Sequence, residues 1–336
     1  MASLKRNNRR SALKSLVTAS LCAPIAVGGQ AVIEGVMMRG PKAMAIAIRR
    51  ADGGIFVKEG KWRSFGRKLT FLKWPFIRGS VVLAEAMING IQALNFSAQE
   101  ALAGIDNDGK RTNADNLSNK AIALAMLSSV AVGLCLFLVI PHLASSFLLK
   151  ILGAGGGVRS FAFHALDGLI KMLIFINYIL LIGRMADIKR LFGYHGAEHK
   201  AIYTYEANKE LCIANAKGYS TLHPRCGTAF IMVVVFVSIG VFATVIPLIS
   251  FSGTGWYVTG EIILTKISLM LPIAGIAYEI TRLADKDAMR RFAAPLIYPG
   301  LLIQTLTTSN PTDDQLEVAI EALKRALKME NDQSID

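Results

Sequence analysis

Four long runs of apolar residues constrain this chain more than any other feature of its sequence. They cover residues 121–149, 161–182, 227–249 and 262–280. A membrane-spanning helix needs about 20 mostly apolar residues. Helices buried in a soluble core rarely stay uncharged on every face over that length, and the run at 227–249 carries no charge at all. The sequence therefore predicts an α-helical membrane protein with about four transmembrane helices.

The positive charges are gathered in particular connections. Lys and Arg number 37 against 24 Asp and Glu, a formal net charge of +13. A basic balance of this size is compatible with binding to nucleic acid, to an acidic partner or to a membrane surface. Residues 183–226 and 281–291 are rich in Lys and Arg, whereas 150–160 and 250–261 contain only Lys150 and Arg159. Because basic loops stay in the cytoplasm, we predict a multi-pass protein of the cell inner (plasma) membrane with both termini and residues 183–226 cytoplasmic. The lipid bilayer is then the expected partner, and nucleic acid is not.

The remaining segments differ from the apolar runs in composition and in hydrophobic periodicity. Residues 28–57 carry glycine-rich strand signals and a hairpin signal at 51–54. Helical periodicity follows over 79–103 and predicts an amphipathic helix that lies on the bilayer or on its neighbours. Together these segments predict a small cytoplasmic or interfacial α+β region. Four cysteines without a close-spaced pair imply no disulfide framework. The predicted organisation is a basic tail at 1–25, the α+β region at 26–103, a linker at 104–120, the cytoplasmic loop at 183–226, and an interfacial segment with a C-terminal amphipathic helix at 281–336.

A few polar residues interrupt the apolar runs. Asp167 and Lys171 are four residues apart and share one helical face. A charged pair inside a span is often functional, but a mutual salt bridge near the outer interface explains the spacing equally well and is the interpretation we prefer. His142 and His164 lie near the predicted outer ends of their helices and are expected at the membrane interface.

The predicted cytoplasmic loop contains three of the five histidines. Its sequence Tyr194–Lys200 reads YHGAEHK, which contains the pattern H-x-x-E-H. On a helix, His195 and His199 lie one turn apart on the same face, a spacing suited to one zinc ion. In the inverzincin order the two histidines hold zinc and the Glu, here Glu198, acts as the base.

A second pair of candidate ligands follows in the same loop. His223 and Cys226 are separated by two residues and end where the third apolar run begins. Pro224 and Gly227 favour a turn that aims both side chains in one direction. We therefore predict a zinc site of His195, His199, His223 and Cys226, with Glu206 as a further candidate. Three readings stay open: a catalytic metal with an open position, a structural metal with a closed shell, and histidines that pair with acids without any metal.

Several motifs together resemble those of the YqhQ-like family of bacterial polytopic membrane proteins. They are GGQAVIEGVMMRGP at 28–41, FGYHGAEHKAI at 192–202, LHPRCGT at 222–228 and LTTSNPTDDQLEVAIEALK at 306–324. Members are commonly labelled predicted metal-dependent enzymes. The resemblance implies that the first two motifs form one functional unit, which adds Gln30, Glu34 and Arg39 to the candidates for binding substrate or supporting the ligands.

Two functions of different classes follow. The first is a metal-dependent hydrolase at the cytoplasmic membrane interface, with Glu198 as general base and Arg225, like Arg39, suited to an anionic substrate. The second is a non-enzymatic accessory subunit of a membrane complex, for example in protein translocation, with a structural zinc site. A transporter is less favoured because three of the four apolar runs carry almost no ionisable residues and no inverted repeat is visible.

Overall fold

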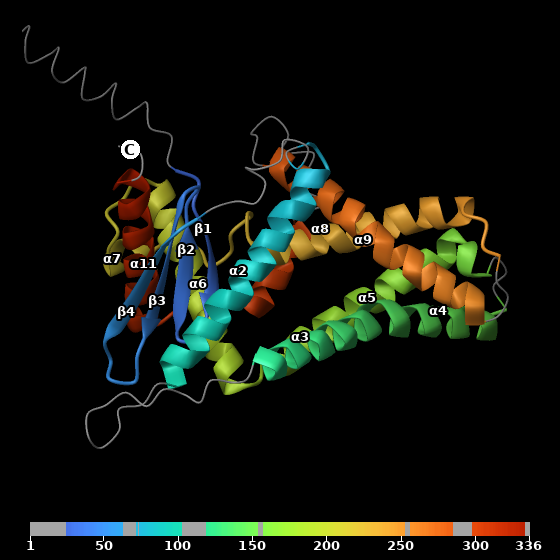
Figure 1. The fold of residues 1–336 in the computed structure, drawn as a ribbon, viewed down its shortest axis with the longest axis horizontal. Coiled ribbons are helices and arrows are strands. Elements are labelled where there is room, and N and C mark those ends of the chain that lie inside the picture. The colour runs from blue at the N-terminus through green and yellow to red at the C-terminus, as the bar shows by residue number, and fades with distance from the viewer. Residues whose placement is uncertain are drawn as a thin grey trace, which may run out of the picture.

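A computed structural model describes residues 25–62, 72, 74–102, 119–153, 157–252, 256–284 and 298–332. Within these residues a small sheet with two packed helices lies at one end of an elongated helical bundle (Figure 1). The predicted basic tail and linker lie, apart from their last residues, outside the described part of the chain.

The sheet is a four-stranded antiparallel meander in the order β1-β2-β3-β4. Tight turns connect the strands, as the glycine-rich sequence predicts. Between β1 and β2, Glu34 adopts a left-handed conformation with φ 53°. In the predicted 51–54 hairpin, Gly53 has φ 84°, and Asp52 Oδ1 accepts a hydrogen bond of 2.8 Å from the Gly54 amide. The strands are β1 (Gly28–Val32), β2 (Gly35–Arg39), β3 (Ala43–Arg49) and β4 (Ile55–Lys61).

Helices cover both faces of this sheet. Because side chains alternate between the faces of a strand, Val36 and Met38 of β2 pack against α6 (Ala186–Glu206) and α11 (Asp313–Asp332), whereas Met37 points to the other face, toward α2 (Ile77–Leu102). The predicted apolar stripe of the C-terminal helix is buried in this core. Its members are Leu316, Ala319, Ile320, Leu323 and, partly buried, Leu327.

The bundle consists of the helices that contain the four apolar runs. They are α3 (Asn119–Leu134), the π-helical turn η3 (Cys135–Val139), α4 (Ile140–Ile151), α5 (Phe161–Ile182), α8 (Gly227–Val245) and α9 (Trp256–Ala284). Along the bundle α4 packs on α5, α5 on α8, and α8 on α9. The fourth run, predicted at 262–280, lies within a longer helix that starts at Trp256 and includes Glu261.

Five helices of the described residues, not four, are long and apolar enough to cross a membrane. The fifth is α2, predicted as an amphipathic helix because Glu85, Asn89 and Gln92 lie off its apolar stripe. Its mean hydropathy of 1.2 is the lowest of the five. One end of α2 packs on α9, where Ser80 donates a hydrogen bond of 2.8 Å to the Leu271 carbonyl. Its other end packs on the sheet through Ala93 and its neighbours.

Inside the bundle, the polar residues that interrupt the apolar runs are buried among the helices. Asp167 and Lys171 form the expected salt bridge at 2.6 Å. His142 and His164, expected at an interface, are each 1% exposed. The π-helical turn that precedes α4 and the packing of α4 on α5 place them in the interior, which sequence position alone does not reveal.

Candidate metal centre

α6 presents two histidines at the junction between the bundle and the sheet. His195 and His199 lie one turn apart, as predicted, with ring centroids 4.5 Å from each other. Small residues allow other segments to approach this helix closely. A side chain at Gly196 would collide with the backbone carbonyl of Ser309, so the glycine lets the 305–310 segment lie directly against the histidine-bearing helix.

Cys226 completes a group of three candidate ligands. It is the N-cap residue of α8, and its Sγ lies 3.1 Å from His195 Nε2. One ligand atom from each of His195, His199 and Cys226 lies within 4.8 Å of the other two. The α8 N-terminus suits a negatively charged sulfur, since its amide and hydroxyl groups at Thr228 approach Sγ at 3.5 and 3.2 Å.

Backbone carbonyls orient both imidazoles. His195 Nδ1 is 2.9 Å from the Thr307 oxygen, and His199 Nδ1 contacts the Thr221 oxygen. A carbonyl only accepts hydrogen bonds, so each Nδ1 carries the proton and each Nε2 presents a lone pair, which is the arrangement that metal-binding histidines usually adopt. His199 Nε2 is buried and has no hydrogen-bond partner among the described residues. Burial also lowers the pKa of His199, which favours the neutral form that binds metals.

Glu198 lies buried beside these histidines, against β1. It is 5% exposed, and a Cβ placed on Gly29 would come within 2.9 Å of its carboxyl carbon. Burial raises the pKa of Glu198, while the nearby imidazoles of His195 and His223 and a hydrogen bond from the Gly29 backbone act in the opposite direction. The first two sequence motifs are therefore in direct contact, through a glycine that leaves room for the carboxylate.

His223 stands beside the three-ligand group and not within it. Its ring centroid is 5.6 Å from that of His199 and 4.5 Å from that of Tyr203, and its Nε2 lies 3.5 Å from Glu206 Oε2. Glu206 also pairs with Arg225. The structure therefore brings three of the four predicted ligands together, and it places the fourth with the two other candidates of the loop.

The three candidates from the N-terminal motif contact residues other than the three candidate ligands. Gln30 faces Gly90 of α2. Glu34 binds Arg190 of α6 at 2.6 Å and accepts a hydrogen bond of 3.3 Å from the Tyr194 hydroxyl. Arg39 stacks over Trp62, 4.7 Å from the ring centroid, and burial lowers the pKa of Arg39. Of the three, Glu34 is the one bonded to α6, and it ties the turn between β1 and β2 to the helix that carries the histidines.

Other residues that hold the centre together could not be singled out from the sequence. Gln304 is fully buried and binds both the amide and the carbonyl of His223, at 2.7 and 2.8 Å. Lys200 is buried and donates to the Lys217 and Tyr219 carbonyls at 2.9 and 2.6 Å. These contacts fix the loop that supplies the Thr221 carbonyl. Any residue type offers a backbone carbonyl, so no sequence signal marks such partners.

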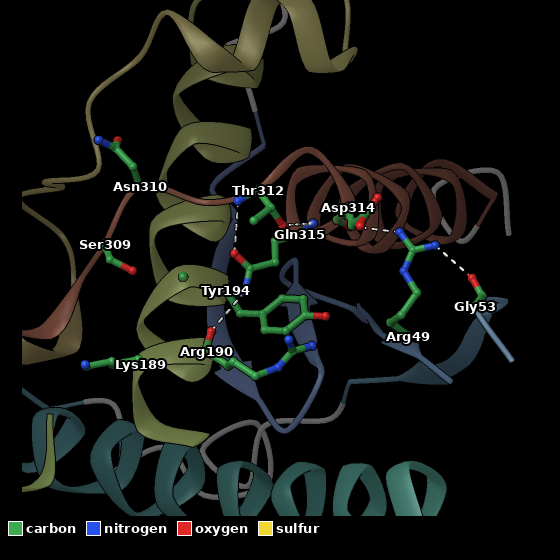
Figure 2. Close-up of a pocket in the computed structure, with 11 residues that line it drawn as sticks. Arg49, Gly53, Lys189, Arg190, Tyr194, Ser309, Asn310, Thr312, Asp314 and Gln315 are labelled. Carbon is green, nitrogen blue, oxygen red and sulfur yellow. Dashed lines mark hydrogen bonds between the residues drawn. The ribbon is translucent and has the colours of Figure 1, made fainter. Parts of the chain in front are cut away.

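Two cavities flank α6. The larger, about 710 Å³, lies between α6 and the start of α11 (Figure 2). Its α6 residues, among them Lys189 and Arg190, occupy the helix face opposite His195 and His199, so it does not open on the ligands. The smaller, about 410 Å³, is lined by segments adjoining the Thr221 and Thr307 carbonyls. Its lining residues are Tyr219, Ser220, Thr221, Leu222, Thr305, Thr308, Ser309 and Asn310.

Comparisons with known proteins agree with the sequence motifs. The family model described as "Protein of unknown function (DUF1385)" matches residues 74–329, which include all three candidate ligands. The chain is 36% identical over 315 residues to "Uncharacterized protein YqhQ" of Bacillus subtilis (strain 168), covering 91% of this chain and 94% of that protein. No solved structure matches the chain. The chain therefore belongs to the DUF1385 family, and it is similar to YqhQ along nearly its whole length.

Proposed function

We propose that this protein is an integral membrane protein that binds a zinc ion through His195, His199 and Cys226 and acts as a metal-dependent hydrolase at the cytoplasmic membrane interface. One observation carries the proposal. Two imidazoles held by backbone carbonyls direct Nε2 lone pairs toward a thiol, and the buried His199 Nε2 has no other partner in the described structure.

The donor set fits zinc. Two imidazole nitrogens and one sulfur suit zinc in chemistry, and three protein ligands leave one coordination position for water or substrate, as is common in catalytic sites. Bound there, zinc would act as a Lewis acid and make a nucleophile available near neutral pH. Methionine-rich surroundings, which would favour copper, are absent from the sequence around the histidines.

The chain's own residues would position the reaction and handle its protons. Glu198 is the group suited to accept and return a proton at its carboxylate, because it adjoins His195 and because burial raises its pKa above that of an ordinary carboxyl. The Thr307 and Thr221 carbonyls keep the imidazoles in a fixed tautomer and orientation. The smaller cavity, lined largely by hydroxyl groups, is the place for the polar part of a substrate such as a peptide bond or a lipid headgroup.

The membrane assignment rests on exposed apolar faces and on charge. Phe147, Leu181 and Leu264 are 65%, 63% and 65% exposed on the bundle surface, and contiguous apolar surface of this kind needs lipid or a partner to cover it. The basic residues gather in the segments around the sheet and α6. We therefore infer that the α3–α4 helix, α5, α8 and α9 cross the plasma membrane and that the metal centre lies on its cytoplasmic side.

A second candidate is a structural zinc in an accessory subunit of a membrane complex. The observation that favours it is that the three ligands join α6 to the start of α8, while the carbonyls that orient them come from two further segments. A metal at this junction would hold four parts of the chain together and need not react.

Metal content and function together separate the two candidates. The full-length protein, His199→Ala and Glu198→Gln would be purified in detergent, assayed for zinc by elemental analysis and tested for complementation of a deletion strain. A hydrolase predicts that Glu198→Gln keeps zinc and fold but loses function, whereas a structural site predicts that it complements fully. Correctly folded parent protein without zinc, even after zinc is supplied, would exclude both.

A further inference from the structure

The smaller of the two cavities beside α6 has a polar lining without charge. Its volume of about 410 Å³ lies within the range of roughly 300–1,000 Å³ that is usual for small-molecule sites. All of its described lining residues except Leu222 offer a hydroxyl or an amide group. Ser309 and Asn310 also line the larger cavity, but the charged residues there line that cavity alone (Figure 2). A charged ligand group would find no counter-charge in the smaller cavity, so this lining suits a neutral polar group.

Several of the lining groups are available to a ligand. The side chains of Tyr219, Thr221, Ser309 and Asn310 make no hydrogen bond to another described residue. The other three hydroxyls are already used within the chain, those of Ser220, Thr305 and Thr308. A hydroxyl both donates and accepts, and an amide group offers a donor and an acceptor side by side. The available groups therefore match a ligand that carries several hydroxyl groups of its own.

Tyr219 also supplies a flat apolar surface to the cavity. Its ring stacks on that of Tyr203, with centroids 6.2 Å apart and ring planes at 16°. Tyr203 is held in place because its hydroxyl donates a hydrogen bond of 3.0 Å to the Leu222 carbonyl. A pyranose sugar has an apolar C–H face and a rim of hydroxyls, so it matches an aromatic ring that lies beside hydroxyl and amide groups. The ring is the feature that favours a sugar over a peptide.

A short helix connects the cavity with the apolar surface of the bundle. Residues 298–307 are helical, and Ile303 packs in one cluster with residues of α5 and α8. Tyr298, Leu302 and the lining residue Thr305 are four and three positions apart, so they share one helix face. Tyr298 and Leu302 are 61% and 51% exposed. A lipid chain that covers these two side chains would lead to the cavity at Thr305.

The cavity adjoins the metal centre on the side away from the ligand atoms. Thr221 lines the cavity, and its carbonyl contacts His199 Nδ1. The Nε2 atoms of His195 and His199, which would hold the metal together with Cys226, are at the other edge of the rings. A group bound in the cavity is therefore the recognised part of a substrate, and the bond to be cleaved belongs to another part of the same molecule. Binding of such a group contributes to a reaction by positioning the part that reacts.

We propose that the smaller cavity binds the neutral sugar headgroup of a membrane glycolipid. The ring of Tyr219 lies against the C–H face of the sugar, the available hydroxyl and amide groups bond to its hydroxyls, and the lipid chains run along the exposed face of the 298–307 helix. This inference names the substrate class of the proposed hydrolase and rests on that proposed function for its reaction. The binding itself requires neither zinc nor Glu198.

Saturation-transfer NMR tests sugar binding by the full-length protein. The protein is purified in a detergent without a sugar headgroup, such as lauryldimethylamine oxide, because a maltoside would compete for the cavity. The probes are the methyl glycosides of glucose, galactose and N-acetylglucosamine, with a blocked neutral dipeptide as the alternative ligand. At least one glycoside should bind saturably, with the strongest transfer to the protons of its C–H face. Binding of none of the glycosides, or of the dipeptide alone, would overturn the proposal.

A second measurement distinguishes a lipid from a soluble sugar. The protein is incubated with phosphatidylcholine vesicles that contain the diacylglycerol glycoside of the sugar that binds best. It is then extracted again, and its bound lipids are counted by native mass spectrometry. A single glycolipid should remain bound, and an excess of the methyl glycoside should displace it. Retention of no glycolipid by a protein that binds the methyl glycoside would overturn the lipid source.

Matched variants locate the sugar in the cavity. Tyr219→Ala removes the stacking surface, so glycoside affinity should fall by about tenfold or more. Tyr257→Ala removes the same ring at an exposed position of α9 and should bind like the parent. Asn310→Ala should weaken binding several-fold, whereas Asn215→Ala, whose amide bonds to the Glu210 carbonyl outside the cavity, should not. Asn310 is exposed, so its variant decides the question if Tyr219→Ala fails to fold. Unchanged binding in a folded Tyr219→Ala or Asn310→Ala protein would refute the assignment.

Zinc content separates this inference from the proposed hydrolase. Glycoside binding should persist in zinc-free protein and in Glu198→Gln, and binding that disappears with zinc would contradict the assignment to the cavity. A folded protein that binds glycoside but never holds zinc would keep the sugar site and exclude the hydrolase. A zinc protein that needs Glu198 for function but binds no glycoside would exclude the sugar site alone.

Discussion

The contact between Gly29 and Glu198 is the smallest feature on which the proposed chemistry depends. A glycine on β1 leaves space for a buried carboxylate on α6, so the strand and the histidine helix meet where a larger side chain would not fit. The position of Glu198 therefore depends on the lack of a side chain at Gly29 as well as on its own helix. This explains why an N-terminal glycine motif accompanies a histidine motif that lies more than 150 residues further along the chain.

Gly29→Ala should accordingly disturb Glu198 without removing a ligand. We expect zinc content to stay at the parent level, complementation to be lost or strongly reduced, and stability to fall by about 1–3 kcal/mol because of overpacking. Gly28→Ala is the control, since a Cβ at Gly28 would meet nothing within 4 Å. Thermal denaturation and complementation measure the two effects, and equal behaviour of the two variants would contradict the role given to this contact.

Removal of His199 and removal of His223 should differ in their effect on metal binding. His199→Ala removes a ligand whose Nε2 has no other use in the described structure, so zinc affinity should fall at least 100-fold, beyond the 10- to 100-fold that loss of a supporting partner typically costs. His223→Ala removes a ring that lies beside the three-ligand group. It should retain at least half of the parent zinc. A chelator titration followed by elemental analysis compares them, and a loss in His223→Ala as large as in His199→Ala would show that His223 is a ligand.

For helices and strands, sequence patterns predicted the features that depend on local periodicity. They did not predict features that depend on how the elements pack against one another. The apolar stripe of α11 and the 51–54 hairpin are local signals, and both were confirmed. The role of α2 depends on two different surfaces. Its first turns pack on α9 and its later turns on the sheet, and Glu85 between them is only 3% exposed, although no window of sequence contains the neighbours that bury it.

The close approach of α2 and α9 can be tested with two glycine-to-alanine substitutions, which should change the stability of the protein in opposite directions. A Cβ on Gly275 would collide with the Phe76 backbone, so Gly275→Ala should destabilise the protein although alanine favours helices. On α8, a Cβ at Gly240 would meet nothing within 4 Å, and Gly240→Ala should stabilise by up to about 1 kcal/mol. Thermal midpoints of the two variants in the same detergent decide the matter. Stabilisation by both would mean that α2 does not dock on α9 as described.

For the whole molecule, the sequence predicted which candidate residues share a helix face better than which of them meet in space. The H-x-x-E-H spacing is enough to place His195 and His199 on one face, and Cys226 was found because it lies two residues beyond another histidine. That His223 instead turns toward Glu206, and that Lys266 reaches Asp167 from another helix, depends on tertiary contacts between segments tens of residues apart. Spacing along the chain contains no information about such contacts.

The shared core of the sheet domain limits how many helices can cross a membrane. Val36 of β2, Ala197 of α6 and Leu323 of α11 lie in one buried cluster, so all three elements must be on the same side. Four crossings, by the α3–α4 helix, α5, α8 and α9, satisfy this condition. A fifth crossing by α2 would put the sheet on one side and both α6 and α11 on the other. We therefore infer that α2 lies along the interface although its length and composition allow it to cross.

Reporter fusions test this topology at two described loops. A cytoplasmic reporter should be active at Asn208, which follows α6, and a reporter that works only outside the cytoplasm should be active at Ser252, between α8 and α9. The C-terminus should behave like Asn208, because an even number of crossings separates them. External activity at Asn208 would reverse the orientation and move the metal centre outside. Opposite signals at Asn208 and at the C-terminus would require an odd number of crossings between them, which the common core of α6 and α11 does not allow.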